Sequence, residues 1–413
     1  MPIKGANGPA GRKEDDMANS SNTVPLQALE PSLIEKVQRI LPDIAGLASE
    51  AERLRSVPPA GVALLRKIGF IRALVPARFG GGEVDFVEFL QALRLLSSAC
   101  VSTGWFAGVV ATHSHGISYY AEQAQAEIWS AGPDTIISSS FAPTGSARIV
   151  DGGYVVSGIW EFSSGSDHAE WVQLGFRVPN PDDPAKSETY LGLFPRRDCE
   201  IVDNWHTVGL KGTGSKRVVV ADAFIPEYRC WGPGILQPSR APGLHDHWLF
   251  RIPFIVTATN FVAVILGGAD GAVAAYRDHL TSRKRAHTGQ PRIDNPLAFV
   301  RLAESVLDIR AASALAESRW AAYVHQAKTG IAPAPDEQMQ SRGDEAYAVR
   351  LAMRAVDRLM DASGGNAIRV ERPIQRFWRD VHAAGGHAYF DLENKLIIVG
   401  RHLVGLEPDP FLF

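Results

Sequence analysis

The chain has 413 residues, of which 46% are hydrophobic and 21% charged, and its formal net charge at pH 7 is −3. This length is ample for two or three domains, and the near-neutral charge argues against nucleic acid or an anionic membrane as the main partner. Cys100, Cys199 and Cys230 lie far apart without CxxC spacing, so neither a disulfide framework nor a zinc site is indicated, and a reducing cytoplasm fits.

The first 24 residues are rich in Gly, Asn, Ser and charge and lack an apolar core, so we expect a disordered leader and no signal peptide. No run approaches eighteen apolar residues, so we expect no membrane-spanning segment. From residue 25 to residue 133, apolar residues recur at spacings of three and four, which predicts an N-terminal helical domain.

Two buried helices are expected late in this domain, over 86–98 and 105–120. The second contains His113 and His115, whose spacing of two puts them on different faces of a helix, so they are not a metal pair. We expect one of them to face inward. It is then either a satisfied core histidine or a hydrogen-bond donor in an active site.

Residues 134–235 show short alternating runs separated by Gly, Pro and Asp, which predicts a central β domain. Separate strands are expected over 135–141, 147–150, 154–162, 171–177, 189–194, 200–208 and 217–224. The glycine-rich run 209–215 lacks the GK[ST] ending and a following helix, so it is a flexible turn and a weak candidate for a phosphate loop.

Residues 152–171 contain the most informative stretch, in which a strand with Trp160 and Phe162 runs into Ser163, Ser164 and Gly165. Aromatic rings can pack against a flat cofactor, hydroxyls can reach its polar atoms, and glycine permits close approach. The alternative is a plain β-hairpin with a serine-rich exit loop.

Residues 236–413 then predict a C-terminal bundle of four to five helices, over 258–279, 299–328, 345–362, 373–381 and 389–403.

This order of helices, β domain and helices, with its punctuating motifs, resembles the acyl-CoA dehydrogenase fold from about residue 30 onward. Four segments support the resemblance: Phe141–Ser146, at the place of the flavin-lining T-E-P-x-x-G-S segment; Trp160–Gly165, at the next flavin-facing strand; Tyr276–Arg283; and Gly364-Gly365 with Arg376 and Arg379-Asp380. The fold class expected is therefore α+β and acyl-CoA dehydrogenase-like.

The chain departs from that family where the catalytic glutamate belongs, because Val381–Ala388 contains no carboxylate. Abstraction of a proton next to a thioester then has no candidate base in this segment. The same region, with His387-Ala388, Asp391 and Gly400-Arg401, is similar to the oxygenase components of two-component flavin-dependent monooxygenases of the para-hydroxyphenylacetate hydroxylase type. The run Trp205–Ser215 also resembles that group.

This resemblance implies that a separate flavin reductase supplies reduced FMN or FAD, that molecular oxygen adds to the flavin as a C4a-hydroperoxide, and that an aromatic substrate is hydroxylated. The protein then supplies orientation, hydrogen bonds and exclusion of water. His387 is implied as the base that deprotonates a phenol; a helix-capping histidine is the alternative. Either Ser163 or Ser164 is the hydroxyl near flavin N5.

The resemblance assigns further positions. A catalytic or substrate-pocket role falls on His113, with Ser139, Trp105 and Phe141 as substrate contacts. The flavin contacts implied are Trp160, Phe162, Ser163, Trp205, Thr213, Ser215, Arg283 and Arg376. The arginines and Ser215 suit phosphate oxygens, although each arginine can instead form a surface ion pair.

Three alternatives remain open from the sequence. The chain is an acyl-CoA dehydrogenase or flavin oxidase with a relocated base, a flavin monooxygenase acting on indole, sulfur or amino nitrogen, or a flavoprotein-like subunit without enzymatic activity. The family resemblance also implies a homotetramer, and the apolar end Leu412-Phe413 is compatible with burial at an interface.

Overall fold

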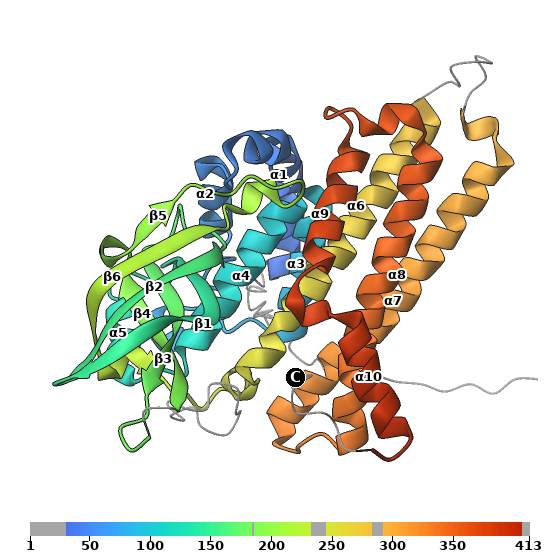
Figure 1. The fold of residues 1–413 in the computed structure, drawn as a ribbon. Coiled ribbons are helices and arrows are strands. Elements are labelled where there is room, and N and C mark those ends of the chain that lie inside the picture. The colour runs from blue at the N-terminus through green and yellow to red at the C-terminus, as the bar shows by residue number, and fades with distance from the viewer. Residues whose placement is uncertain (1–29, 184–185, 233–244, 283–291, 407–413) are drawn as a thin grey trace, which may run out of the picture. The chain divides into compact units, whose positions relative to one another are not determined.

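The computed structural model describes residues 30–183, 186–232, 245–282 and 292–406. Residues 32–413 form a single unit, within which helices, a sheet and then more helices follow the order expected from the sequence (Figure 1). The predicted domain boundaries themselves stay predictions. Arg283, the leader and Leu412-Phe413 lie outside the described residues.

The N-terminal helices are α1 (Leu33–Leu54), α2 (Pro59–Lys67), α3 (Phe86–Ala99), α4 (Val101–Ile117) and α5 (Glu122–Ile128). A capping box begins α1, because the Ser32 hydroxyl accepts from the Glu35 amide and the Glu35 carboxylate accepts from the Ser32 amide. Pro59 stands at the first position of α2, where its fixed φ favours the helix. Figure 1 shows α4 between the sheet and the helices α3, α6 and α9.

The described strands form one seven-stranded sheet in the order β5-β6-β2-β1-β3-β4-β7. Their bounds are β1 Ile137–Val150, β2 Gly153–Ser163, β3 Trp171–Pro179, β4 Ser187–Pro195, β5 Glu200–Val202, β6 Lys216–Pro226 and β7 Cys230–Trp231. Strands β1 and β3 pair in parallel, and the other neighbours pair antiparallel.

The C-terminal helices are α6 (Asn260–Ser282), α7 (Pro296–Thr329), α8 (Pro335–Ser363), α9 (Pro373–Gly385) and α10 (Leu392–Leu403). Before α6 lies the 3₁₀ segment η7 (Phe254–Thr259), and between α9 and α10 lies η10 (Ala388–Phe390). Helix α6 packs against α3, α8 and α9, so the N-terminal and C-terminal helices share one apolar core.

Several expected elements differ in the structure. The runs 135–141 and 147–150 are one continuous strand β1, because a register irregularity between Ser140 and Gly145 lets the chain bend without leaving the sheet. The strand expected over 200–208 stops at Val202. The final helix begins at Leu392, since Tyr389 and Phe390 belong to η10.

One segment of the described chain, Phe254–Ser282, is long and apolar enough to cross a membrane by length and composition. Of its most apolar window, 67% is buried inside the protein. The apolar character therefore reflects the position of α6 in the centre of the helical core, where it has apolar neighbours on several sides.

Candidate active site

One face of α4 is the common wall of the candidate site. Trp105, Val109 and His113 are 6%, 5% and 5% exposed, and every other non-glycine residue of this buried helix is less exposed. Residues at positions i, i+4 and i+8 share a helix face, so these three side chains form one stripe. The ends of the stripe are about 12 Å apart at a rise of 1.5 Å per residue.

At one end of the stripe, the structure brings together His113, Ser139 and Phe141, to which the family resemblance gave substrate-pocket roles. The ring of His113 lies 5.4 Å from that of Phe141, in a T-shaped arrangement. His113 Nδ1 is 2.8 Å from the Ile137 carbonyl oxygen, which can only accept, so Nδ1 carries a proton. Burial lowers the pKa of His113 to about 4. The neutral ring then accepts at Nε2 from the Ser139 hydroxyl, at 2.7 Å.

Both histidines of α4 are buried, whereas only one was expected to face inward. His115 Nε2 donates to the Leu249 carbonyl at 2.9 Å, and its ring stacks on Phe250. Burial lowers its pKa to about 4 as well. His115 therefore lies in the protein core, where its Nδ1 has no hydrogen-bond partner among the described residues, and His113 is the one that reaches the stripe.

At the other end of the stripe, Trp105 begins a directed chain of hydrogen bonds. Its Nε1–H donates to Ser164 Oγ at 3.1 Å, and Ser164, Ser215 and Thr213 follow with spacings of 2.7 Å between successive hydroxyls. The Thr213 hydroxyl donates to the Leu210 carbonyl at 2.9 Å. Each hydroxyl has one proton, so Ser215 must donate to Thr213 and Ser164 to Ser215. Ser164 Oγ keeps one unused acceptor lone pair.

The two neighbouring serines differ sharply. Ser164 belongs to this chain of hydrogen bonds and is slightly exposed, whereas Ser163 is fully buried and its hydroxyl has no partner. Gly165 has a φ of 77°, and a Cβ there would come within 2.8 Å of the Phe106 ring. Gly165 thus permits close approach to α4. The sequence had predicted that it would permit close approach to a cofactor.

Trp160 and Phe162, two aromatic residues of β2, also differ in their burial. Trp160 is fully buried in the sheet core and donates to the Gly175 carbonyl at 2.6 Å, so the structure does not support the direct flavin contact predicted for it. Side chains two positions apart point to the same face of a regular strand, so Phe162 should lie on the same face as Trp160. A register irregularity between Trp160 and Ser163 and a φ of 63° at Phe162 break the alternation, and the ring is 70% exposed.

Trp205 lies beside this exposed ring. The two aromatic rings are 5.9 Å apart and perpendicular, and Trp205 Nε1 donates to the Leu210 carbonyl at 3.0 Å. A non-glycine residue with a positive φ is costly and is found disproportionately at functional sites. Phe162 and Trp205 therefore form an accessible aromatic surface next to Ser164.

His387 lies on the turn between α9 and α10. Its ring is 4.6 Å from that of Phe261 and 5.7 Å from that of Trp105, and Phe261 stacks on Trp105 at 4.3 Å. His387 Nδ1 accepts the Tyr389 amide proton at 3.2 Å, which caps η10. The helix-capping role is thus real, and it leaves the proton of the neutral ring on Nε2.

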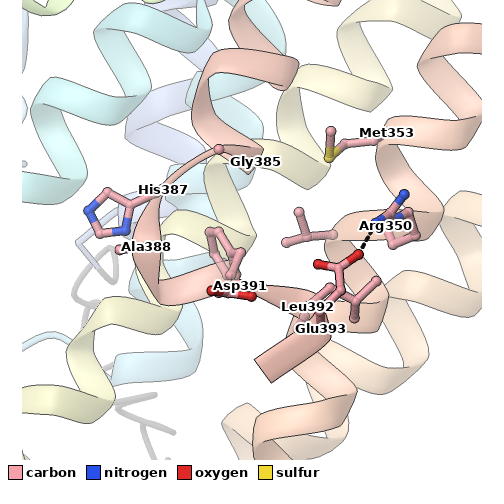
Figure 2. Close-up of a pocket in the computed structure, with 12 residues that line it drawn as sticks. Arg350, Met353, Gly385, His387, Ala388, Asp391, Leu392 and Glu393 are labelled. Carbon is pink, nitrogen blue, oxygen red and sulfur yellow. Dashed lines mark ion pairs between the residues drawn. The ribbon is translucent and has the colours of Figure 1, made fainter. Parts of the chain in front are cut away.

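Partial desolvation by these neighbours lowers the pKa of His387, so the imidazole is neutral at pH 7. The residue also borders a recess of about 350 Å³ that Met353, Arg350 and Glu393 line on the other side. Figure 2 shows its ring pointing away from those residues. The imidazole therefore belongs to the cluster with Trp105 and Phe261.

Two family models match the chain, that of the acyl-CoA dehydrogenase N-terminal domain over residues 33–132 and that of the C-terminal domain over residues 259–392. The p-hydroxyphenylacetate 3-hydroxylase oxygenase component of Acinetobacter baumannii is 38% identical over 92% of this chain and 90% of its own length. The flavin-dependent monooxygenase oxygenase subunit HsaA of Mycobacterium tuberculosis is 37% identical over 91% and 96%. The crystal structure of 3-HSA hydroxylase from Rhodococcus sp. RHA1 superposes with a TM-score of 0.86 at 35% identity, covering 93% of this chain and 99% of the other.

The chain belongs to the oxygenase components of two-component flavin-dependent monooxygenases. It is thus a flavin-dependent monooxygenase subunit that uses reduced flavin to hydroxylate an aromatic substrate, and a separate reductase is its partner. The sequence predicted this family, fold and reaction class, and they are confirmed. Two observations argue against the acyl-CoA dehydrogenase alternative: these relatives are monooxygenases, and 381–388 lacks a carboxylate.

The residues at the end of β2 fit a reduced flavin in this oxygenase component. Phe162 and Trp205 offer an exposed aromatic surface, and Ser164 offers an unused acceptor to an N–H group such as N5–H of the reduced ring. Of the serine pair, the structure thus favours Ser164. Ser215 and Thr213 continue the chain of hydrogen bonds behind Ser164 and are more deeply buried, at 4% and 1% exposed against 8% for Ser164.

Arg376 lies elsewhere. It is buried between α9 and α1, where Nη1 donates to Ser49 Oγ at 3.3 Å. This position in the helical core does not support the contact with flavin phosphate predicted for it. The other predicted arginine, Arg283, lies outside the described residues.

Three residues of the site were missed from the sequence. Phe261 and Phe254 complete the walls beside Trp105 and Phe141, since Phe254 contacts Phe141 at 5.2 Å. Asp380 accepts the Leu210 amide proton at 2.7 Å and so holds the loop that ends the hydrogen-bond chain. Only Asp380 carried a signal, as part of the Arg379-Asp380 motif.

Proposed function

We propose that the substrate of this oxygenase component is a phenol and that His387 acts on the phenolic oxygen. The observation that carries the proposal is the place of His387, next to Phe261 and to Trp105, whose indole N–H in turn donates to Ser164. An aromatic ring bound against Trp105 and Phe261 would have a histidine at one edge. The relative from Acinetobacter baumannii, named for p-hydroxyphenylacetate, has a phenolic substrate and supports the same class.

The role of His387 follows from its hydrogen bonds. Tyr389 donates to Nδ1, so Nε2–H is a donor in the neutral ring. A donor at the phenolic oxygen stabilises the phenolate, and the ionised ring is the better nucleophile. This donor role differs from direct proton abstraction, which requires the tautomer without the Tyr389 contact. At pH 7 the lowered pKa of His387 keeps the imidazole neutral.

The remaining residues divide by task. Bound reduced flavin supplies the activation of molecular oxygen. Phe162, Trp205 and Ser164 would hold the flavin ring, and Trp105 would fix Ser164 through its N–H. The His113–Ser139 pair would contact a polar group of the substrate at the far end of the stripe, with Phe141 and Phe254 excluding water beside it.

The test compares wild type with His387→Asn and His387→Ala, supplied with reduced flavin and oxygen, on a set of phenols and their O-methyl ethers. We expect hydroxylated phenol from wild type, a several-fold lower ratio of product to reduced flavin for His387→Ala, and an intermediate ratio for His387→Asn, which keeps an N–H donor. The ethers should give no product. Proton abstraction, in place of donation, would be supported by two results together. The ratio of product to reduced flavin would fall equally in both variants, and wild-type hydroxylation would decline at low pH as His387 becomes protonated. Unchanged hydroxylation by His387→Ala would contradict any role of His387.

We also propose that the chain assembles as a homotetramer in a reducing cytoplasm. Large apolar side chains are exposed on two helices, where a second copy would cover them: Leu297, Phe299, Val300 and Leu307 on α7, and Leu396, Ile397 and Leu403 on α10. Light scattering coupled to size exclusion should give four times the 44.8 kDa chain mass. A monomer at micromolar concentration would contradict the proposal.

A further inference from the structure

A buried carboxylate on α8 joins two elements of the site. Glu345 is 2% exposed. Three hydroxyls reach it: Thr259 Oγ1 and Tyr323 Oη lie 2.7 Å and 3.2 Å from Oε1, and Tyr389 Oη lies 2.7 Å from Oε2. Trp320 Nε1 in turn donates to Thr259 Oγ1 at 2.8 Å. Burying a carboxylate is costly, so a full set of donors is needed to keep it there.

Two of the three partners stand next to site residues in the chain. Thr259 precedes Phe261 by two positions, and Tyr389 follows His387 by two. The rings of Phe261 and His387 are in contact at 4.6 Å. Glu345 therefore ties the start of α6 to the turn after α9, and the two rings that meet in the site come from the two segments that it holds.

The third partner provides a contrast. Tyr323 lies in α7, far along the chain from His387 and Phe261, and it donates to the same carboxylate. Loss of either tyrosine hydroxyl removes one donor from Glu345. Only the loss of the Tyr389 hydroxyl also releases the turn that carries His387.

We propose that Glu345, acting through the Tyr389 hydroxyl, is a positioning residue that holds the His387 imidazole against Phe261 and Trp105. The inference rests on the proposed role of His387. Glu345 touches neither the substrate nor the flavin; it fixes η10, and the amide of Tyr389 in η10 fixes the His387 ring through Nδ1.

The matched variants are Tyr389→Phe and Tyr323→Phe, with Glu345→Gln and Glu345→Ala for comparison. The two tyrosine variants lose the same chemical group from the same carboxylate, so a purely structural role of Glu345 predicts similar effects. A positioning role predicts that the ratio of product to reduced flavin falls at least threefold in Tyr389→Phe, with KM little changed, and stays near wild type in Tyr323→Phe. Glu345→Gln, which keeps the shape and one acceptor oxygen, should retain more activity than Glu345→Ala.

A second readout needs no flavin. Diethyl pyrocarbonate modifies unprotonated imidazole, and the rate at His387, followed by peptide mass spectrometry against pH, gives the pKa of that residue. The rings against His387, those of Trp105 and Phe261, carry no titratable group. The titratable groups on its own turn are Tyr389 and Asp391, and Arg350 and Glu393 line the recess behind it. Release of the turn should move the imidazole away from the apolar rings of Phe261 and Trp105, so its pKa should rise toward 6.5 in Tyr389→Phe and not in Tyr323→Phe.

The outcomes separate the two proposals. If His387→Ala impairs hydroxylation while both tyrosine variants resemble wild type in product ratio and in modification rate, the positioning role is wrong and the role of His387 stands. The positioning role is also wrong if both tyrosine variants are impaired alike. If His387→Ala hydroxylates as well as wild type, both proposals fail.

Discussion

Trp105 and Ser164 are joined by a hydrogen bond of 3.1 Å from the indole N–H to the hydroxyl oxygen. The bond connects α4 to the end of β2, and the same indole stacks on Phe261 and lies beside His387. One side chain thus contacts both the serine proposed to bind the flavin and the histidine proposed to act on the substrate. The relative placement of these two groups depends on Trp105.

Ser164 and Ser163 should respond differently to replacement by alanine. Ser164→Ala removes an acceptor for flavin and interrupts the hydrogen-bond chain, so the ratio of hydroxylated product to reduced flavin should fall roughly tenfold or more. Ser163→Ala removes a hydroxyl that has no partner, so product ratio and unfolding free energy should stay near wild type. Product analysis with hydrogen peroxide quantitation checks both. The reverse order of effects would assign the flavin contact to Ser163.

Trp105→Phe isolates the contribution of the indole N–H. Phenylalanine keeps an aromatic ring against Phe261 but donates no hydrogen bond to Ser164. We expect a several-fold increase in hydrogen peroxide at the expense of product, with less than about 1.5 kcal/mol lost from the free energy of unfolding. A variant with wild-type product ratio would show that Ser164 needs no fixing by Trp105.

Burial of His115 predicts acid sensitivity of the fold. Its folded pKa of about 4 lies below the 6.5 of the unfolded chain, so the unfolded state binds more protons between these values and stability falls as pH drops through that window. One such group accounts for a loss of about 2 kcal/mol between pH 7.5 and pH 5. His115→Gln can keep a donor for the Leu249 carbonyl. Urea unfolding at both pH values measures the fall in unfolding free energy between pH 7.5 and pH 5. This fall should be smaller in His115→Gln than in wild type by about 2 kcal/mol. An identical fall in the two proteins would contradict the assignment.

Asp380 should matter for the Leu210 loop. Asp380→Ala leaves the buried Leu210 amide without an acceptor and should cost about 1–3 kcal/mol of unfolding free energy. Asp380→Asn keeps an acceptor oxygen and should cost less than about 1 kcal/mol. Burial raises the pKa of Asp380 to about 6, so its charged form is disfavoured in the fold, and asparagine also removes that penalty above pH 6. Chemical denaturation at pH 7.5 compares the two, and equal losses would contradict this role for the hydrogen bond.

Much of the site was predictable because its residues belong to short motifs that can be recognised in the sequence. The aromatic-to-serine transition at 162–164 and the His387 segment without a carboxylate are visible in the chain itself, and the helix period places His113 on a face of α4. The pairing of His113 with Ser139 depends on how β1 crosses α4, which the family resemblance supplied.

Other features required the tertiary structure. Strand alternation alone puts Trp160 and Phe162 on one side, and only the irregularity before Ser163 exposes the second ring. In the sequence, Glu345 occupies an ordinary polar position of an amphipathic helix. Nothing in the sequence shows that Thr259, Tyr323 and Tyr389 surround its carboxylate. Arg376 looks like a phosphate ligand by residue type, but the packing of α9 against α1 turns it toward Ser49.

The most direct test of the account is incorporation of ¹⁸O₂. The purified chain is mixed anaerobically with reduced flavin and a phenol and then exposed to labelled oxygen. We predict one ¹⁸O atom in the hydroxylated product and a product yield close to the reduced flavin consumed; the chain alone, given NADH and oxidised flavin, should give neither NADH oxidation nor product. Unlabelled product, or hydrogen peroxide alone with flavin reoxidised at the rate seen without protein across the whole set of phenols, would contradict the account.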